Sequence, residues 1–457
     1  MPAFALQEIV AATNAHIYNK VEQEFSDIVT DTRKISAGVL FVALQGERFN
    51  GEDFAAEALA KGAAGVVVSK ACAPEQLAKC QGTVLQVEDT LTAYQLMAKA
   101  WREKFPQVKM VAITGSNGKT TTKDLTAAVL SARGAVLKTQ ANFNNEIGLP
   151  LTLLGLRAEH TAAVVEIGMR GFHQIEALAP IAQPQIGIVT NVGETHMELL
   201  GSLENIAKAK QELVEAIPAG GTVILNADNK YVAAMAAAAK AGVKVMTFGM
   251  EADADVRGEA LHTEGNCTKF MVTYKNERHE YSVNMVGRHN VYNTLAAITA
   301  GFALGLSPEE VCRGLGNLQA TKMRFELQQV KEWQVVNDAY NASPMSMTAA
   351  INTLSELAKG RKIAVLGDML ELGSVSKEAH LHVGQEVAEH NFTALITRGE
   401  MGEFIAEGAE AKGMTAVYRC DSHEAAAAQL QKILQPGDTL LFKGSRGMQM
   451  EKIIDLL

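Results

Sequence analysis

The residues best suited to chemistry are those of TGSNGKTTT, at positions 114–122, which follow an apolar run and precede a helix-like segment. The glycines at 115 and 118 let the backbone approach a ligand closely, and a strand-to-helix turn aims consecutive N–H groups and the positive end of a helix dipole at an anion. Lys119 would neutralise the β and γ phosphates of a nucleotide, and the hydroxyl of Thr120 would reach a Mg²⁺ ion. The predicted phosphate-binding loop consists of Thr114, Gly115, Ser116, Asn117, Gly118, Lys119 and Thr120.

This loop departs from the general G-x-x-x-x-G-K-[ST] pattern, because Ile113 stands where the first glycine would be. The structural alternative is a glycine-containing turn between a strand and a helix. The strand-like run before the loop, the helix-like segment after it and the three consecutive threonines favour nucleotide binding over that alternative. They leave the type of reaction open.

Two further strand-like runs end near side chains that could bind a metal ion. Glu166 lies at the end of AAVVE, and His196 follows PQIGIVTNV. Ligands of open α/β sheets collect outside the carboxyl ends of the strands, so both side chains would face the loop. Either residue alone is more often structural or merely solvated. Their joint placement beside a phosphate loop favours a metal site.

Lys210 lies in the helix-like segment SLENIAKAKQELVEAI. A lysine on an inward face is desolvated, which lowers its pKa and leaves the amine able to react. Such an amine could combine with CO₂ to give a carbamate, an anionic Mg²⁺ ligand. The alternative is a lysine whose stem packs while its ammonium reaches water. At helical spacing Lys210 shares one face with Leu203, Ile206, Ala207, Val214 and Ile217.

The elements that must position these residues indicate an α/β protein of several domains, because 457 residues exceed what one core usually organises. Alternating strand-like and helix-like runs from residue 108 onward predict a parallel sheet with helices on both faces, followed by antiparallel strands between 254 and 286. We predict three domains: a small N-terminal α/β domain (1–82), a central domain with the phosphate loop on a parallel sheet (83–317) and a C-terminal Rossmann-like domain (318–457).

Composition excludes several classes of protein. A formal net charge of −9 argues against a nucleic-acid partner, because binding to phosphates needs a basic face. No apolar run reaches the roughly 18 residues that span a bilayer, and the first ten residues lack a secretory pattern. We therefore expect no membrane insertion and a cytoplasmic location. The five cysteines contain no close C-x-x-C pair, so neither a zinc knuckle nor a disulfide framework is indicated.

Several motifs together resemble the Mur ligases, a family within the ATP-dependent amide-forming enzymes. The resemblance implies ATP and Mg²⁺ as cofactors and, because the family carbamylates the lysine fourteen positions after the strand-end histidine, a carbamylated Lys210. The motifs are TGSNGKTTT, VVEIGM, NVGETHMELLGS with AKAKQEL, GRHNVYNTLAA, MRFE, DAYNASP, LGDMLELG and KGSRGM.

Within the family, DAYNASPMSM, LGDMLELG and ANFNNEIGLPLTLL resemble the member that adds D-alanyl-D-alanine to UDP-N-acetylmuramoyl-tripeptide. The segment DTRKISAGVLFVALQGERFNGEDF resembles the domain that binds the uridine nucleotide. Val39, Glu52 and Ser343 stand where Asp, His and Asn are usual. The alternatives are a ligase that adds diaminopimelate, lysine or glutamate and, less favoured, a P-loop ATPase that is not a ligase or a dinucleotide-dependent oxidoreductase. The third residue of the acceptor peptide stays open, and we expect a monomer.

The resemblance implies roles for individual residues. One Mg²⁺ would be held by Thr120 and Glu166, and a second by His196 and carbamylated Lys210. The catalytic residues would be Lys119, Lys210 and His196. Beyond the loop, the nucleotide would be bound by Asn290, Arg324 and Asp338. The substrate-binding residues would be Thr32, Arg33, Asn144, Asn145, Asn341 and Arg446.

Overall fold

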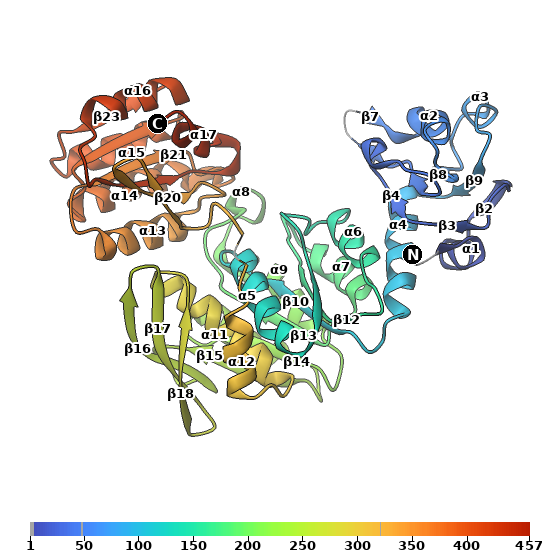
Figure 1. Cartoon of the computed structure of the whole chain (residues 1–457), viewed down its shortest axis with the longest axis horizontal. Helices are drawn as coiled ribbons and strands as arrows, with labels where there is room; N and C mark the ends of the chain where they lie inside the picture. Colours follow the sequence, from blue (N-terminus) through green and yellow to red (C-terminus); the bar gives the residue numbers. More distant parts are fainter. Residues whose placement is uncertain (1–3, 47–48, 320) are drawn as a thin grey trace. The chain divides into compact units, whose positions relative to one another are not determined.

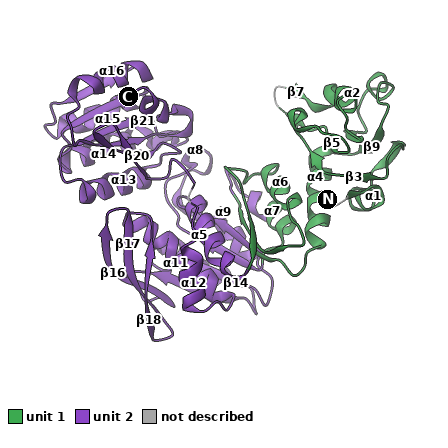
Figure 2. Cartoon of the chain, viewed as in Figure 1, with its two compact units in different colours: residues 1–110, 134–167, 177–184 green, residues 111–133, 168–176, 185–457 purple. Residues whose placement is uncertain are grey.

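The computed structural model describes residues 4–46, 49–319 and 321–457. The chain divides into two units, which are coloured separately in Figure 2. Unit 1 comprises residues 1–110, 134–167 and 177–184, and unit 2 comprises residues 111–133, 168–176 and 185–457. Strands and helices alternate through both units, which confirms the predicted α/β class. No helix in the described part of the chain is long and apolar enough to cross a membrane.

Unit 1 contains a five-stranded sheet in the order β2-β9-β8-β5-β4. Its strands are parallel except for β2, which runs antiparallel to β9. The valines of β8 are buried because the strand lies inside the sheet. Its strands are β2 (His16–Asn19), β4 (Ile28–Val29), β5 (Leu40–Val42), β8 (Gly65–Ser69) and β9 (Thr83–Val87).

The rest of unit 1 consists of short strand pairs and helices. β1 (Phe4–Ala5) pairs with β3 (Glu24–Phe25), β6 (Gln45–Gly46) with β7 (Phe49–Asn50), and β11 (Ala135–Lys138) with β12 (His160–Glu166). The helices are α1 (Leu6–Thr13), α2 (Ala55–Ala60), α3 (Pro74–Leu77), α4 (Thr90–Glu103) and α6 (Gly148–Leu154). α7 (Gln174–Ala182) is divided between the two units.

The central sheet of unit 2 runs in the order β10-β13-β14-β15-β16-β17-β18. Neighbouring strands are parallel as far as β16, and β17 and β18 are antiparallel additions, as the sequence predicts for residues 254–286. The carboxyl ends of β10 and β13 therefore meet at one edge, where the phosphate loop begins. The strands are β10 (Lys109–Thr114), β13 (Ile186–Val189), β14 (Thr222–Asn226), β15 (Lys244–Gly249), β16 (Val256–Glu264), β17 (Cys267–Tyr274) and β18 (Glu277–Val283).

The helices of this part of unit 2 follow its strands along the chain (Figure 1). The alanine-rich run at 233–241 does not form one helix, because α10 gives way to a 3₁₀ turn at Met235–Ala238. The helices are α5 (Lys119–Leu130), α8 (Met197–Leu200), α9 (Leu203–Ala216), α10 (Lys230–Ala234), α11 (Arg288–Ala303) and α12 (Pro308–Leu315).

The C-terminal part of unit 2 is a second, six-stranded sheet in the order β19-β20-β24-β21-β22-β23. Only β19 is antiparallel to its neighbour. The side chains of β21 alternate between two cores: Ala364 and Leu366 pack in one, and Ile363 and Val365 in the other. Helices therefore cover both faces, which confirms the predicted Rossmann-like architecture (Figure 1).

The apolar runs WQVVND, KIAVLGD, TALIT, TAVYRC and TLLFKG predict five strands here, and the structure has them as β20 (Trp333–Asp338), β21 (Lys362–Gly367), β22 (Ala394–Arg398), β23 (Val417–Cys420) and β24 (Thr439–Lys443). The sequence missed β19 (Glu326–Val330). The domain bounds 1–82, 83–317 and 318–457 stay predictions. The C-terminal helices are α13 (Pro344–Leu357), α14 (Ser376–Glu389), α15 (Gly402–Ala411), α16 (His423–Ile433) and α17 (Glu451–Asp455).

Arg102, at the end of α4, generates a prediction about the turn that leads into β10. Its buried guanidinium donates to the carbonyl oxygens of Phe105 at 2.5 Å, Val108 at 3.3 Å and Ala182 at 3.3 Å. Arg102→Met would remove all three bonds and leave the oxygens of Val108 and Ala182 without this donor, so we expect the free energy of unfolding to fall by about 3 kcal/mol. Urea titration checks the value. Lys99→Met on the same helix is the control, and an equal loss in both variants would contradict the prediction.

Candidate active site

The phosphate loop has the strand, glycine turn and helix that the sequence predicts. Gly118 immediately precedes α5 with a φ of 80°, and a Cβ atom there would lie 2.3 Å from Asn293 Oδ1. At Gly115 a Cβ atom would lie 1.9 Å from Thr190 Oγ1. Larger residues at either position would collide with the neighbouring segment. The close approach of the backbone that the two glycines suggested is therefore present.

The segment after β13 fixes the shape of the loop. The backbone N–H of Asn117 donates to Asn191 Oδ1 at 2.8 Å, and Thr190 Oγ1 donates to the carbonyl oxygen of Asn117 at 2.7 Å. Ser116 Oγ donates to the carbonyl oxygen of Gly193 at 2.9 Å. The sequence analysis missed Thr190 and Asn191, although their position directly after a strand adjacent to β10 could have indicated them.

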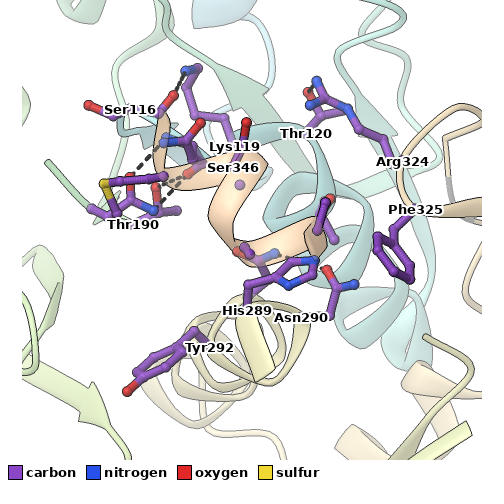
Figure 3. Close-up of a pocket in the computed structure, with 18 of the residues that line it drawn as sticks. Ser116, Lys119, Thr120, Thr190, His289, Asn290, Tyr292, Arg324, Phe325 and Ser346 are labelled. Atoms are coloured by element: carbon purple, nitrogen blue, oxygen red, sulfur yellow. Dashed lines mark hydrogen bonds between the residues drawn. The ribbon is translucent and has the colours of Figure 1, made fainter. Parts of the chain in front are cut away.

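Lys119 and Thr120 lie at the start of α5 (Figure 3). Lys119 Nζ donates to the carbonyl oxygens of Gly115 at 2.6 Å and Ser116 at 3.3 Å, so its charge lies over the loop. Arg324 Nη2 donates to the hydroxyl of Thr120 at 3.2 Å. A residue predicted to bind nucleotide from the C-terminal region thus contacts the loop directly.

A cavity of about 340 Å³ opens beside the loop, within unit 2 (Figure 3). A volume of this size is suited to a small organic ligand. Four residues predicted from separate parts of the sequence line it together with loop residues 116–120: Asn290, Arg324, Asp338 and Asn341. Thr114 and Gly115 belong to the loop but lie outside this lining.

Asp338 is held by two contacts at the end of β20. Its carboxylate accepts from Lys443 Nζ at 2.6 Å and from the backbone N–H of Phe325 at 3.0 Å. Lys443 also donates to the carbonyl oxygen of Asn341 at 3.0 Å. Burial lowers the pKa of Lys443, and the charge of Asp338 opposes that shift. The sequence analysis missed Lys443 as a site residue, although it begins the KGSRGM motif.

Lys210 is buried on α9, which confirms the predicted inward face. Burial lowers the pKa of Lys210 well below its ordinary value, and the positive charge of Lys119 lowers it further. The pKa of His196 is lowered to about 4, chiefly because its half-buried position partly removes the imidazole from water. The charge of Glu371 opposes this shift, and the charges of Lys210 and Lys119 add to it. At neutral pH the imidazole of His196 is therefore uncharged.

The candidate residues of unit 1 have local partners. Glu166 ends β12 in a buried position, and Asn144 Nδ2 donates to its Oε2 at 3.4 Å. Asn145 Oδ1 accepts from the backbone N–H of Gly148, where α6 begins. Thr32 and Arg33 lie in a 3₁₀ turn, and the exposed guanidinium of Arg33 binds the carboxylate of Asp31 at 2.7 Å. Substrate binding by these residues stays a prediction.

Two predictions from the C-terminal motifs have different outcomes. Asn341 lines the cavity, whereas Arg446 lies outside its lining and pairs with Glu451 at 2.6 Å. Across residues 4–46, 49–319 and 321–457, no three side chains of His, Cys, Asp or Glu gather as a metal-binding group.

Comparison with known families supplies the classification. The model of the Mur ligase middle domain matches residues 113–301, and that of the Mur ligase, glutamate ligase domain, matches residues 323–446. The model described as the Mur ligase family, catalytic domain, matches residues 24–102. The chain belongs to the Mur ligase family. The resemblance inferred from the sequence motifs is thus confirmed.

This Mur ligase is similar along its length to curated relatives. The UDP-N-acetylmuramoyl-tripeptide--D-alanyl-D-alanine ligase of Bacillus subtilis is 39% identical over 436 residues, which are 93% of this chain and 92% of the relative. The enzyme of the same name from Escherichia coli is 35% identical over 432 residues, 94% of this chain and 93% of the relative. Neither match is confined to the nucleotide-binding segment.

Solved structures of MurF enzymes are similar in fold to this Mur ligase. A crystal structure of MurF from Acinetobacter baumannii has a TM-score of 0.91 at 30% identity and covers 100% of this chain and 99% of that one. MurF from Thermotoga maritima, in complex with ADP, has a TM-score of 0.83 at 26% identity, with 94% and 96% covered. The three-domain fold that the sequence predicts is therefore that of known relatives.

His289, which lines the cavity at the start of α11, generates a prediction about pH. Burial lowers its pKa to about 4, with Asp338 opposing the shift and Lys443 adding to it. Because the folded-state pKa lies below the ordinary value, the unfolded chain binds a proton first as pH falls from about 6.5 toward 4. We expect His289 to cost about 2 kcal/mol of stability between pH 7 and pH 5.

Urea unfolding at the two pH values measures this cost. In His289→Gln the loss of stability between pH 7 and pH 5 should be smaller than in the unmodified protein. His382→Gln, on the exposed surface of α14, is the control. An unchanged pH dependence in His289→Gln would show that the folded protein does not keep this imidazole neutral.

Proposed function

We propose that this Mur ligase joins D-alanyl-D-alanine to UDP-N-acetylmuramoyl-tripeptide and converts ATP to ADP and phosphate. The observation that carries the proposal is the full-length similarity to relatives named for this activity, at up to 39% identity over more than nine tenths of both chains. ADP in the structure of one such relative supports a nucleotide as the ligand of the cavity beside the phosphate loop.

A carboxylate and an amine do not condense readily in water, because the carboxylate is a poor electrophile and its oxygen a poor leaving group. In the proposed reaction the acceptor carboxylate attacks the γ-phosphorus of ATP, the bond to ADP breaks, and an acyl phosphate forms. The amine of D-alanyl-D-alanine then attacks the acyl carbon, loses a proton and expels phosphate. The site must supply positive charge where these anions meet.

Lys119 and Arg324 are the cations that would supply it. Lys119 Nζ now donates to two loop carbonyls and would turn to the β and γ phosphates. Arg324 reaches Thr120, so its guanidinium lies beside the start of α5 and would bind phosphate oxygens. Asn290, also in the cavity lining, would contact the base, and Asp338 would fix Lys443 and the backbone of Phe325 around the nucleotide.

The donors present fit Mg²⁺. Thr120 offers a hydroxyl in the cavity lining, and His196 is kept neutral, so a ring nitrogen has a free lone pair. A carbamate on Lys210 would add anionic oxygens, which Mg²⁺ prefers. When bound, Mg²⁺ neutralises charge on the phosphates and the acceptor carboxylate. A role for Glu166 beside Thr120 stays a prediction, as do the monomeric state and the cytoplasmic location.

The surroundings of Lys210 support the proposed carbamate. Burial and the charge of Lys119 lower the pKa of the Lys210 amine, which favours the neutral, nucleophilic form. Attack of the nitrogen on CO₂ forms an N–C bond, and loss of a proton leaves an anion. That anion would then be stabilised by Lys119, whose positive charge opposes the lysine but favours the carbamate.

Phosphate release with a panel of amines tests the function. We expect release with UDP-N-acetylmuramoyl-tripeptide and ATP to require D-alanyl-D-alanine, and to be negligible with diaminopimelate, lysine or glutamate. Acceptors ending in diaminopimelate and in lysine determine the third-residue preference. Lys119→Met, which keeps the stem and loses the charge, is the inactive control. Release that depends on a single amino acid instead, or on no amine, would replace the proposed activity with one of the alternatives.

Lys210→Ala tests the carbamate. We expect activity to fall by at least about 100-fold and to recover in part with added formate or acetate, which can occupy the place of the carbamate. A carbamate signal in ¹³C NMR with labelled bicarbonate should be present in the unmodified protein and absent from the variant. Lys208→Ala, on the exposed face of α9, is the matched control. Full activity of Lys210→Ala without additives would contradict the prediction.

A further inference from the structure

Glu371, in the LGDMLELG motif of the C-terminal region, faces the imidazole of His196. Glu371 Oε2 lies 2.7 Å from His196 Nδ1, although the two groups are not aligned for a hydrogen bond. The histidine side chain is 23% exposed and the glutamate 46%, so the contact lies at the edge of the buried site. Arg170 Nη2 lies 3.8 Å from the other carboxylate oxygen, but it is 72% exposed and screened by water. Of these two contacts of the Glu371 carboxylate, the one with His196 is therefore the closer and the better shielded from water.

Backbone geometry supports the same contact. His196 and Glu371 both have positive φ, 57° and 64°, a conformation that residues other than glycine rarely adopt. The backbone N–H of Glu198 donates to the carbonyl oxygen of Glu371 at 3.4 Å, and a Cβ atom on Gly373 would lie 2.9 Å from Glu198 Cα. The segment 371–373 is thus docked on the start of α8 by main-chain contacts as well as by the carboxylate.

The motif is also held firmly by its own domain. The backbone N–H of Met369 donates to the buried His380 Nε2 at 2.9 Å, and that of Leu370 donates to Ser445 Oγ at 2.8 Å. The side chain of Asp368 accepts from the backbone N–H of Gly402 at 2.7 Å. Glu371 therefore extends from a braced segment, as a residue that orients another side chain should.

A carboxylate at Nδ1 determines which ring nitrogen of a neutral histidine carries the proton. With the proton on Nδ1, Nε2 keeps the lone pair, and a histidine that ligates a metal usually donates its other N–H to such an acceptor. We propose that Glu371 is a positioning residue: a small rotation of the imidazole aligns Nδ1–H with the nearby carboxylate, which holds His196 in the Nδ1–H form and turns Nε2 toward the metal site. This inference rests on the proposed role of His196 as a Mg²⁺ ligand.

The inference joins two regions of the chain. His196 belongs to the nucleotide-binding part of unit 2, and Glu371 to its C-terminal part, in the LGDMLELG motif that resembles the family member adding D-alanyl-D-alanine. Their contact makes the proposed metal ligand depend on a residue of that motif. Lys119 and, to the extent that it is protonated, Lys210 lower the pKa of His196, and Glu371 supplies the opposing negative charge.

Mn²⁺ binding tests the proposal without relying on turnover. Electron paramagnetic resonance of the full chain with a non-hydrolysable ATP analogue gives the Mn²⁺ dissociation constant. We expect about 10- to 100-fold weaker binding in Glu371→Ala and a smaller loss in Glu371→Gln, whose amide oxygen can still accept from Nδ1–H. Glu378→Gln, which removes an exposed charge from α14 nearby, is the matched control and should bind as the unmodified protein does.

The tautomer of His196 is the second measurement. Ring ¹⁵N NMR should show the Nδ1–H form in the unmodified protein and a shift toward the Nε2–H form in Glu371→Ala, with His196→Asn identifying the signals. An unchanged tautomer together with unchanged Mn²⁺ affinity in Glu371→Ala would overturn the proposal, as would tighter Mn²⁺ binding, which would make Glu371 a competitor for the imidazole. If His196→Asn binds Mn²⁺ normally, the assigned metal ligand is wrong, and the proposed ligase activity is not affected.

Discussion

The positive charge of Lys119, at the N-terminus of α5, is the constraint on which the rest of the site depends. It lowers the pKa values of Lys210 and His196, which burial has already shifted in the same direction. Both groups are thereby biased toward their neutral forms, which are the forms that the proposed carbamate and the proposed nitrogen ligand require. If Lys119, Lys210 and His196 were all charged, their mutual repulsion in this shielded site would be unfavourable in the absence of anions. The substrates of the proposed reaction supply such anions, namely phosphates and a carboxylate.

The C-terminal part of unit 2 completes the surroundings of the loop. Arg324 donates to Thr120, and Ser343 Oγ donates to Asn117 Oδ1 at 2.8 Å. Ser343 is one of the positions where the chain departs from the usual family pattern, and its hydroxyl makes this contact to the loop. Asp124, further along α5, accepts from both the backbone N–H and the hydroxyl of Thr321. The helix that begins at the loop is thus bonded to the start of the C-terminal region.

Much of this arrangement could be predicted from the sequence, because it depends on local signals. The loop 114–120 is marked by glycines between a strand-like run and a helix-like run. Lys210 interrupts an apolar helical face. The C-terminal strands are short apolar runs between helices. Thr190, Lys443 and Glu371 were missed as site residues because their roles depend on contacts with residues distant in the chain. β19 was missed because ELQQV lacks a buried apolar face. The assigned chemical roles and the domain bounds are still predictions.

The two hydrogen bonds from Lys119 Nζ to the loop carbonyls have a consequence for turnover. When a nucleotide binds, Lys119 must give up these two hydrogen bonds to contact the phosphates. The free energy lost with the two bonds offsets part of the attraction between the lysine and the phosphates. The loop already holds its shape, so little ordering accompanies entry of the nucleotide. Affinity for the nucleotide is thus moderated while the geometry is kept, and the lysine has carbonyl partners to which it returns when the nucleotide leaves.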